Sequence, residues 1–500
     1  MKLVPLVLAM ASLMASVTAA QDAFPTVQVS HVGSTATTSG PSIEEPSRGL
    51  RFRADRADLT TQQGAGRRSI WQVLVGSQGR KRRAVPSRVR RRRASTKKRQ
   101  AGSCKAPTST QSSSSTTTSA PTPSSTVDAD TKTATNKVMA GYWPDWVNSN
   151  FPPTQIDFTK FDMLNYAFAL PTAQFDLSIP TDPSGGLLRS FVKACKAGNT
   201  KALLSIGGWG GSTYFSPAVR TSASRKTFIT NILKVYNQYG LDGIDLDWEY
   251  PGQTGAGNQL DASDTANFQT FLTELRAALP QGALITGAVS HNPWMASNGQ
   301  PVQSVARAAA AMDYVMIMNY DVWGSSSVPG PNAPLANLCG NSTQPGASAA
   351  AGVKQWSAAG MPRDKILLGI PSYGYINTSS KKTLRTRAVG LSSLDGSSGS
   401  GQINFNMLVQ QGALKKGADG LYDGAGGFTK YWDDCSDTPF LSDGSRVVSY
   451  DDTSSTFDKG AFASAAAIGG ISMWSIDGDT KDWALVNSAI AGMSSTTASS

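Results

Sequence analysis

Residues 241–249 read Leu-Asp-Gly-Ile-Asp-Leu-Asp-Trp-Glu, and this stretch decides how the chain folds. Apolar residues alternate with carboxylates here, which predicts a β-strand with Asp245, Asp247 and Glu249 on one face. Three like charges at this spacing repel one another, so we expect at least one to hold a proton near neutral pH. Carboxylates that share protons suit acid catalysis. A calcium site or a solvated strand edge is the alternative, but calcium loops carry their acids in glycine-rich turns.

The basic character of the chain belongs to its N-terminal region. The 500 residues carry a formal net charge of +11, which by itself suggests an anionic partner. Residues 1–100, however, hold 19 basic and 5 acidic side chains, whereas the remaining 400 hold 27 basic and 30 acidic ones. The globular part is therefore mildly acidic, and we expect it to bind no nucleic acid.

The N-terminus has the pattern of a secreted precursor. Residues 1–20 have a basic start, an apolar core and small residues at the end, which predicts a signal peptide and an extracellular protein without a membrane anchor. Residues 21–99 are polar and basic, and are interpreted as a largely disordered propeptide; a retained basic arm or a misplaced gene start remain as alternatives. Residues 100–136 form a Ser/Thr/Pro-rich linker, and residues 493–500 a Ser/Thr tail.

Residues 137–492 alternate between strand and helix patterns. The pattern predicts eight strands, at 138–142, 163–169, 202–207, 243–248, 284–289, 314–320, 366–370 and 470–474. Helical periods lie between most of them, for example at 228–239 and at 268–279, where Asp264 is a candidate cap. This alternation predicts an α/β fold, a (β/α)8 TIM barrel. The segment at about 376–469 is too long for a simple connection, so we expect a small α+β insertion between strands seven and eight.

The predicted strand ends are rich in aromatic and acidic residues. In such a barrel the chemistry lies at the carboxyl ends of the strands. All but one of these ends carry an aromatic side chain, and they form no cationic cluster, which disfavours phosphate substrates. Aromatic faces beside hydrogen-bonding acids suit sugar rings. A lone aromatic residue usually packs in the core, but that explanation is weak for the whole set.

The cysteines and the sequons fit an oxidising compartment. Cys339 and Cys435 both lie in Gly/Ser/Asp-rich segments and are the favoured disulfide pair, whereas Cys195 lies in a helical stretch and is expected to be a buried free thiol. Asn341 and Asn377 begin N-glycosylation sequons on predicted loops. With two histidines in the chain and no ligand spacing among the cysteines, we expect no metal site.

Four motifs resemble those of glycoside hydrolase family 18, in the family's order over about residues 138–492. Residues 242–249 are similar to its Asp-x-x-Asp-x-Asp-x-Glu signature, and Ser205-Ile206-Gly207-Gly208 to its third-strand motif. Met318-Asn319-Tyr320-Asp321 is similar to its sixth-strand motif, and Trp474 is placed like the tryptophan under its cleavage subsite. With the leader and linker, the chain most resembles a secreted chitinase of fungal type.

The resemblance implies retaining hydrolysis of β-1,4-linked N-acetylglucosamine polymers through an oxazolinium ion formed by the substrate's own acetamido group. It implies that Glu249 is the acid, that Asp247 orients the acetamido group, that Asp245 shares a proton with Asp247, and that Tyr320 donates to the attacking oxygen. Asp242 has the opposite strand parity and is expected to be structural. The substrate-binding residues would be Tyr142, Gly208, Trp209, Tyr250, Met318, Asn319, Asp321, Tyr373 and Trp474.

The expected protein is thus a monomeric, cofactor-free chitinase that acts on chitin or chitooligosaccharides in polysaccharide catabolism. We predict endo-acting cleavage, although the insertion would deepen the cleft, which tends towards exo or processive action. A non-catalytic chitin lectin, an endo-N-acetylglucosaminidase acting on glycoprotein glycans and a wall-bound scaffold are the alternatives. The acid at Glu249 argues against the lectin. The long aromatic cleft argues against the endo-N-acetylglucosaminidase, and the four motifs argue against the scaffold.

Overall fold

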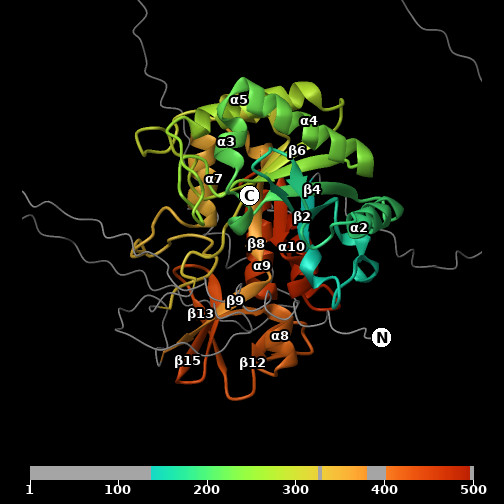
Figure 1. Ribbon diagram of the computed structural model, residues 1–500. Coiled ribbons are helices and arrows are strands. Elements are labelled where there is room, and N and C mark those ends of the chain that lie inside the picture. Colours follow the sequence, from blue (N-terminus) through green and yellow to red (C-terminus); the bar gives the residue numbers. More distant parts are fainter. Residues whose placement is uncertain (1–136, 325–328, 380–400, 496–500) are drawn as a thin grey trace, which may run out of the picture. The chain divides into compact units, whose positions relative to one another are not determined.

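The computed structural model describes residues 137–324, 329–379 and 401–495 (Figure 1). The predicted signal peptide, the basic region, the linker and Cys104 lie outside the described residues, as does the tail from residue 496 onward. The last helix, α10 (Ala484–Ser494), extends two residues beyond the expected end of the barrel domain. Within the described part of the chain, no helix is both long and apolar enough to cross a membrane.

Eight parallel strands close into a barrel, as the sequence predicts. Their order is β1-β16-β8-β7-β6-β5-β4-β2, and a pairing of β1 with β2 closes the ring. A short strand, β3 (Leu177–Ser178), pairs antiparallel with the end of β2. The eight barrel strands are β1 (Val138–Pro144), β2 (Met163–Pro171), β4 (Lys201–Gly207), β5 (Gly243–Asp247), β6 (Leu284–Val289), β7 (Tyr314–Ile317), β8 (Ile366–Pro371) and β16 (Gly470–Trp474).

Helices connect the strands on the outside of the barrel. The two expected amphipathic helices are present as α4 and α5, although Asp264 is the first residue of α5 and not its cap. Short 3-10 turns occur at 145–147, 153–155, 158–160, 209–211, 363–365 and 476–478. Besides α10, the barrel helices are α2 (Gly186–Ala197), α3 (Phe215–Arg220), α4 (Ser222–Tyr239), α5 (Asp264–Ala278), α6 (Ala306–Ala311), α7 (Ala349–Ala358) and α9 (Thr453–Ala465).

The apolar side of β5 packs under these helices. Trp248 is 2% exposed, and its ring stacks on Phe215 of α3 at 5.3 Å and meets Phe268 of α5 edge-on at 5.2 Å. Ile244 and Leu246 belong to the same buried cluster. Burying a large side chain of this kind stabilises the fold by about 1.5–3 kcal/mol. Because side chains alternate along a strand, this packing turns the carboxylates of β5 into the barrel.

Aspartates fasten the amino ends of three neighbouring strand pairs. Each lies just before its own strand, and its Oδ2 accepts a hydrogen bond from a backbone N–H of the adjacent strand. The pairs are Asp162 with Met139 at 2.9 Å, Asp242 with Ala202 at 3.0 Å, and Asp313 with Ile285 at 2.8 Å. The structural role predicted for Asp242 is therefore confirmed.

The segment after β8 forms an α+β subdomain, as expected. Five antiparallel strands lie in the order β10 (Gln402–Asn404), β9 (Tyr373–Thr378), β15 (Arg446–Ser449), β14 (Thr438–Ser442) and β13 (Thr429–Asp433). Helix α8 (Phe405–Gln410) and a hairpin of β11 (Leu414–Lys416) and β12 (Tyr422–Gly424) complete it (Figure 1). The expected range of 376–469 is wrong at its end, because α9 packs against α10, β8 and β16 and so belongs to the barrel.

Buried charges join the subdomain to the barrel. Lys459 of α9 pairs with Asp451, and both side chains are completely buried. Lys430 of β13 lies 2.5 Å from Asp452, the residue that caps α9. Removing either partner of such a pair leaves an uncompensated charge in the protein interior. The first pair therefore holds α9 to the segment that follows β15, and the second holds β13 to the start of α9.

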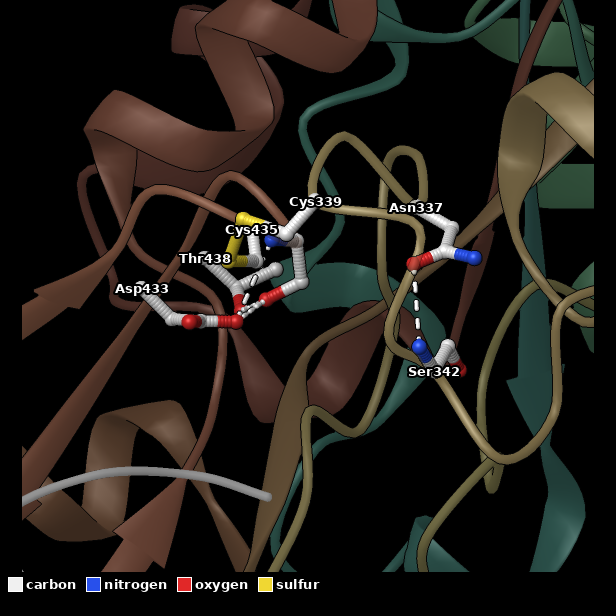
Figure 2. The surroundings of a disulfide bond; sticks show 7 residues. Asn337, Cys339, Ser342, Asp433, Cys435 and Thr438 are labelled. Carbon is white, nitrogen blue, oxygen red and sulfur yellow. Dashed lines mark hydrogen bonds between the residues drawn. A yellow bond between two sulfur atoms is a disulfide. The ribbon is translucent and has the colours of Figure 1, made fainter. Parts of the chain in front are cut away.

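A disulfide between Cys339 and Cys435 confirms the expected pairing (Figure 2). It joins the loop after β7 to the turn between β13 and β14, and backbone bonds from Leu335 to Ser436 and from Leu338 to Cys435 run beside it. Cys195 is a buried free thiol in α2, also as expected.

The two sequons differ in their surroundings. Asn341 is exposed outside the helices and strands, in agreement with the prediction of a loop. Asn377 lies in β9, pairs with Val447 of β15 and is 8% exposed, so its predicted loop position is wrong. A buried strand position leaves a glycan no room in the folded chain, and Asn341 stays as the candidate.

Candidate active site

The three acids of the opening stretch form a graded row. Asp245 is 0% exposed, Asp247 5% and Glu249 9%, so solvent access increases towards the carboxyl end of β5. Removing carboxyl groups from water disfavours their charged form, and burial is the main cause of a raised pKa at all three. The arrangement therefore favours the protonated form of all three acids relative to water.

Asp245 is held by three hydroxyl groups inside the barrel. Its Oδ1 accepts a bond from Thr286 of β6 at 2.6 Å, and its Oδ2 accepts bonds from Ser205 of β4 at 2.6 Å and Tyr142 of β1 at 3.0 Å. Tyr142, expected to bind substrate, is 3% exposed and supports Asp245; its contact with substrate stays a prediction. Sequence reasoning missed Thr286, although its register opposite Asp245 follows from the pairing of β5 with β6.

Asp247 has an oxygen that no protein group satisfies. Its Oδ1 is buried and finds no hydrogen-bond partner among the described residues. Burial first, and then the charges of Glu249 and Asp245, raise its pKa well above the usual range. A buried oxygen without a partner is costly, so it marks a place where a ligand group completes the bonding. The proton expected to pass between Asp245 and Asp247 stays a prediction.

Glycine is needed where β4 passes Asp247. A Cβ at Gly207, where φ is +113°, would lie 2.2 Å from the backbone oxygen of Asp247. Gly208 has φ +84°, is buried, and donates its backbone N–H to that same oxygen at 2.8 Å. Gly208, expected to touch substrate, therefore supports β5 through a backbone hydrogen bond to Asp247.

Glu249 is fixed through its backbone and tuned through its carboxyl. Its N–H donates to Ser212 Oγ at 3.0 Å, and its carbonyl oxygen accepts a bond from Asn258 at 2.5 Å. Burial raises the pKa of the carboxyl to about 7, a hydrogen bond from the Tyr250 hydroxyl opposes this, and the charge of Asp321 adds to it. Glu249 is thus a proton donor up to neutral pH.

Three predicted site residues, Met318, Asn319 and Tyr320, lie in the segment that follows β7. Burial and the charges of Asp247 and Asp321 raise the pKa of Tyr320 well above its usual range, so its hydroxyl stays protonated and can donate. Met318 is half-buried beside it. Asn319 is 0% exposed and its Oδ1 bonds His291 Nε2 at 2.9 Å, so its predicted contact with substrate stays a prediction.

Asp321 lies where the barrel and the inserted subdomain meet. Its Oδ1 accepts hydrogen bonds from Tyr373 at 2.7 Å and from Tyr375 at 2.6 Å, both on β9. The side chain of Asp321 is exposed to solvent, whereas Tyr373 and Tyr375 are 4% and 7% exposed. Tyr375 is a site residue that sequence reasoning missed, and the Tyr-x-Tyr spacing on one strand face was the available signal.

Aromatic rings cluster around Trp474 at the end of β16. Phe168 stacks on it at 5.5 Å and Tyr142 meets it edge-on at 5.4 Å. Trp146 lies 6.3 Å away and is 55% exposed, and Trp209, a predicted sugar contact, is 50% exposed. Exposed tryptophan faces of this kind suit the apolar face of a sugar ring, and Trp146 was not predicted.

Known proteins share this fold and much of this sequence. Residues 138–479 match the family described as glycosyl hydrolases family 18. A chitinase-like effector of Moniliophthora roreri is 36% identical over 391 residues, which are 72% of this chain and 94% of the relative. A class V chitinase of Arabidopsis thaliana is 31% identical, over 68% and 86% of the two chains.

Solved structures of chitinases are also similar to this chain in fold and sequence. A crystal structure of a chitinase from Rhizomucor miehei has a TM-score of 0.63 and 32% identity, over 71% of this chain and all of the other. A variant class V chitinase from Nicotiana tobaccum in complex with NAG4 has a TM-score of 0.60 and 27% identity, over 72% and 99% of the two chains. The closed barrel, the acids of β5 and these similarities show that the chain belongs to glycosyl hydrolases family 18 and is a hydrolase of the chitinase type.

Proposed function

We propose that the protein is an endo-acting chitinase that retains the anomeric configuration by substrate-assisted catalysis. The observation that carries this proposal is the pair at the end of β5. Glu249 holds a proton up to about pH 7, and Asp247 beside it has a buried oxygen without a partner among the described residues. One group is suited to protonate a leaving oxygen, and the other to accept an N–H from the substrate.

In the first step, Glu249 gives its proton to the glycosidic oxygen as the bond from that oxygen to the anomeric carbon breaks. The carbonyl oxygen of the acetamido group on the same sugar attacks the anomeric carbon and closes an oxazolinium ring. Once its proton has passed to Asp245, Asp247 is ionised: its Oδ1 accepts the acetamido N–H, and its negative charge stabilises the cation. Tyr320 donates to the attacking oxygen and so holds it in line.

In the second step, the Glu249 carboxylate removes a proton from water. The water oxygen attacks the anomeric carbon, the oxazolinium ring opens, and Glu249 is protonated again. Two displacements at one carbon leave the configuration unchanged. The substrate supplies the nucleophile, so the mechanism needs no second carboxylate on the opposite face of the sugar.

The surrounding residues support this chemistry. The three hydroxyls on Asp245 hold its carboxyl in place inside the barrel, where its charge raises the pKa of Asp247. Trp474 provides the stacking surface, and Met318 and Asp321 line the pocket. The chitinase structure that contains NAG4 supports chitooligosaccharides as the substrate class. The leader at residues 1–20 supports secretion, and hence a role in breaking down extracellular chitin.

A binding function without cleavage is the second candidate. Two relatives, from Moniliophthora roreri and Moniliophthora perniciosa, are named chitinase-like effectors. The protein keeps a carboxyl group at the acid position and a raised pKa there, which a protein that only binds chitin has no need of. Release of products from defined oligomers separates the two functions.

The test uses Glu249→Gln, which keeps the shape of the side chain but has no proton to give. We expect the wild-type chain to cut the hexamer of N-acetylglucosamine internally and to release the β-anomer first, as seen by NMR. General acid catalysis contributes about 10²–10⁴-fold, so the variant should lose activity by that factor.

Glu274→Gln is the matched control. Glu274 lies on α5 and pairs with Arg225 at 2.9 Å, away from β5, so the same chemical change there should leave turnover unaltered. Equal activity of the Glu249 variant and the wild type would disprove the role of the acid. A wild-type chain that binds the hexamer but releases nothing would support the binding function instead.

A further inference from the structure

The inserted subdomain meets the active site at the carboxylate of Asp321. Tyr373 and Tyr375 lie on the same face of β9, and both hydroxyls donate to Asp321 Oδ1. Among the described residues, no group forms a hydrogen bond with Asp321 Oδ2. Two donors on one oxygen leave the other oxygen of this solvent-exposed carboxylate ready to accept a bond from substrate.

Tyr375 itself is turned away from solvent. It is 7% exposed, and Gln402 of β10 donates a bond from Nε2 to its hydroxyl oxygen at 3.2 Å. An amide nitrogen can only donate, so the Tyr375 proton is directed to Asp321. Tyr375 therefore affects a sugar through Asp321 and not by its own contact.

The backbone of Asp321 is fixed from the same side. Its N–H donates to Asn332 Oδ1 at 2.9 Å, and Asn332 Nδ2 donates to the carbonyl oxygen of Tyr373 at 3.0 Å. Asp321 has φ +58°, a conformation that needs support from its surroundings in a residue other than glycine. Backbone and side chain are thus both held by β9 and its neighbours.

We propose that Tyr375 is a positioning residue of the hydrolysis reaction, which aims the free oxygen of Asp321 at a hydroxyl group of the bound chitooligosaccharide. This inference rests on the proposed function and deepens it, because it assigns to the inserted subdomain a part in substrate binding. The donor pair also stabilises the ionised form of Asp321, which is the form that accepts a bond with either oxygen.

The ionisable groups around Asp321 come from three elements. Glu249 and Tyr250 follow β5, Tyr320 precedes Asp321 after β7, and the two tyrosines of β9 complete the set. Surrounding protein raises the pKa of Asp321, and the hydroxyls of Tyr375 and Tyr373 lower it. Loss of one hydroxyl should raise this pKa, so Asp321 would lose its charge at a higher pH as the solution is acidified.

The test compares Tyr375→Phe with the wild type on the tetramer of N-acetylglucosamine. A lost hydrogen bond to a charged group predicts a fall in kcat/KM of about tenfold, and a rise of the acidic limb of its pH profile by about one unit. In a chain that already carries Asp321→Asn, the same change should cost less than about twofold, since coupled residues are not additive.

Tyr431→Phe is the matched control. Tyr431 lies on β13 of the same sheet, where its ring stacks on Phe440 at 5.1 Å, so its variant should match the wild type in kcat/KM. A Tyr375 variant that melts earlier but keeps kcat/KM and its acidic limb would overturn the inference. So would a full tenfold loss in the Asp321→Asn background, because it would show an effect that does not pass through Asp321.

Two further measurements keep the outcomes apart. If Tyr375→Phe does not fold, Gln402→Met frees the Tyr375 proton while keeping both tyrosines, and should shift the acidic limb in the same direction. If the wild-type chain cuts nothing, the proposed function fails, and calorimetry with the tetramer still decides on Tyr375. About tenfold weaker binding by Tyr375→Phe would then support the positioning role, and an unchanged Kd would reject it.

Discussion

The protonation of Glu249 gives the sharpest test of the active-site electrostatics. Burial, helped by the charge of Asp321, raises its pKa from the ordinary 4.5 to about 7, which favours the protonated form by roughly 3 kcal/mol. At pH 6 a carboxyl with a pKa of 4.5 would be about 3% protonated, whereas one with a pKa of 7 is about 90% protonated. Because the acid must carry its proton, kcat/KM should fall as pH rises through about 7.

Two substitutions should move this basic limb in opposite directions. The Tyr250 hydroxyl bonds the ionised carboxylate and lowers the pKa of Glu249, so Tyr250→Phe should move the limb to higher pH, by about one unit. The charge of Asp321 raises the pKa of Glu249, so Asp321→Asn should move the limb to lower pH. The direction of each shift of the basic limb, and not its size, decides the test.

The assay follows the hydrolysis of a chitooligosaccharide at concentrations well below KM between pH 4 and 9, because kcat/KM reports the pKa of the acid in the free enzyme. Melting curves at each pH separate the titration of the acid from unfolding. Shifts in the same direction for both variants would refute the account, because one removes a stabiliser of the ionised form and the other removes a charge that destabilises it. A wild-type limb near 4.5 would refute the raised pKa itself.

Three other predictions concern the site and the fold. Asp247→Asn should lose activity about as severely as Glu249→Gln, since an amide cannot stabilise the cation; near wild-type turnover would contradict substrate assistance. Replacing Cys339 and Cys435 by serine opens a crosslink between residues 96 apart and should lower stability to urea by up to about 4.7 kcal/mol; an unchanged midpoint would show that the loop is held otherwise. Lys459→Met leaves the buried Asp451 without its cation and should cost about 3–5 kcal/mol, and a second change of Asp451→Leu should restore much of this.

The barrel and the central acids could be predicted because local pattern carries them. Alternation at period two in residues 241–249 requires one buried apolar face, and the structure packs Trp248 outward and turns Asp245 inward. The disulfide was also predictable, since few cysteines lay in loop-like sequence. These features depend on neighbours in the sequence or on a small set of candidates.

The contacts that sequence reasoning did not foresee have partners that are remote in the sequence. Tyr142 and Gly208 were placed against substrate because they end strands, yet one bonds Asp245 and the other supports the backbone at Asp247. Asn319 was placed likewise and is completely buried against His291. Tyr375 was missed because its role depends on Asp321, 54 residues away. Periodicity can place two tyrosines on one strand face, but it does not identify their partner, because such contacts follow from how the loops and the subdomain pack.

The sequence by itself determined that a strand would present three carboxylates to one face, that about eight strands would alternate with helices, and that the strand ends would suit a sugar. Those properties are set by side-chain parity and by composition, which are local. Only the tertiary structure decided how the acids differ from one another. Asp245 receives three hydroxyls, Asp247 keeps an oxygen without a partner among the described residues, and Glu249 keeps its proton up to about pH 7. The physical reason is that a pKa depends on burial and on charges brought close by folding, wherever they stand in the chain.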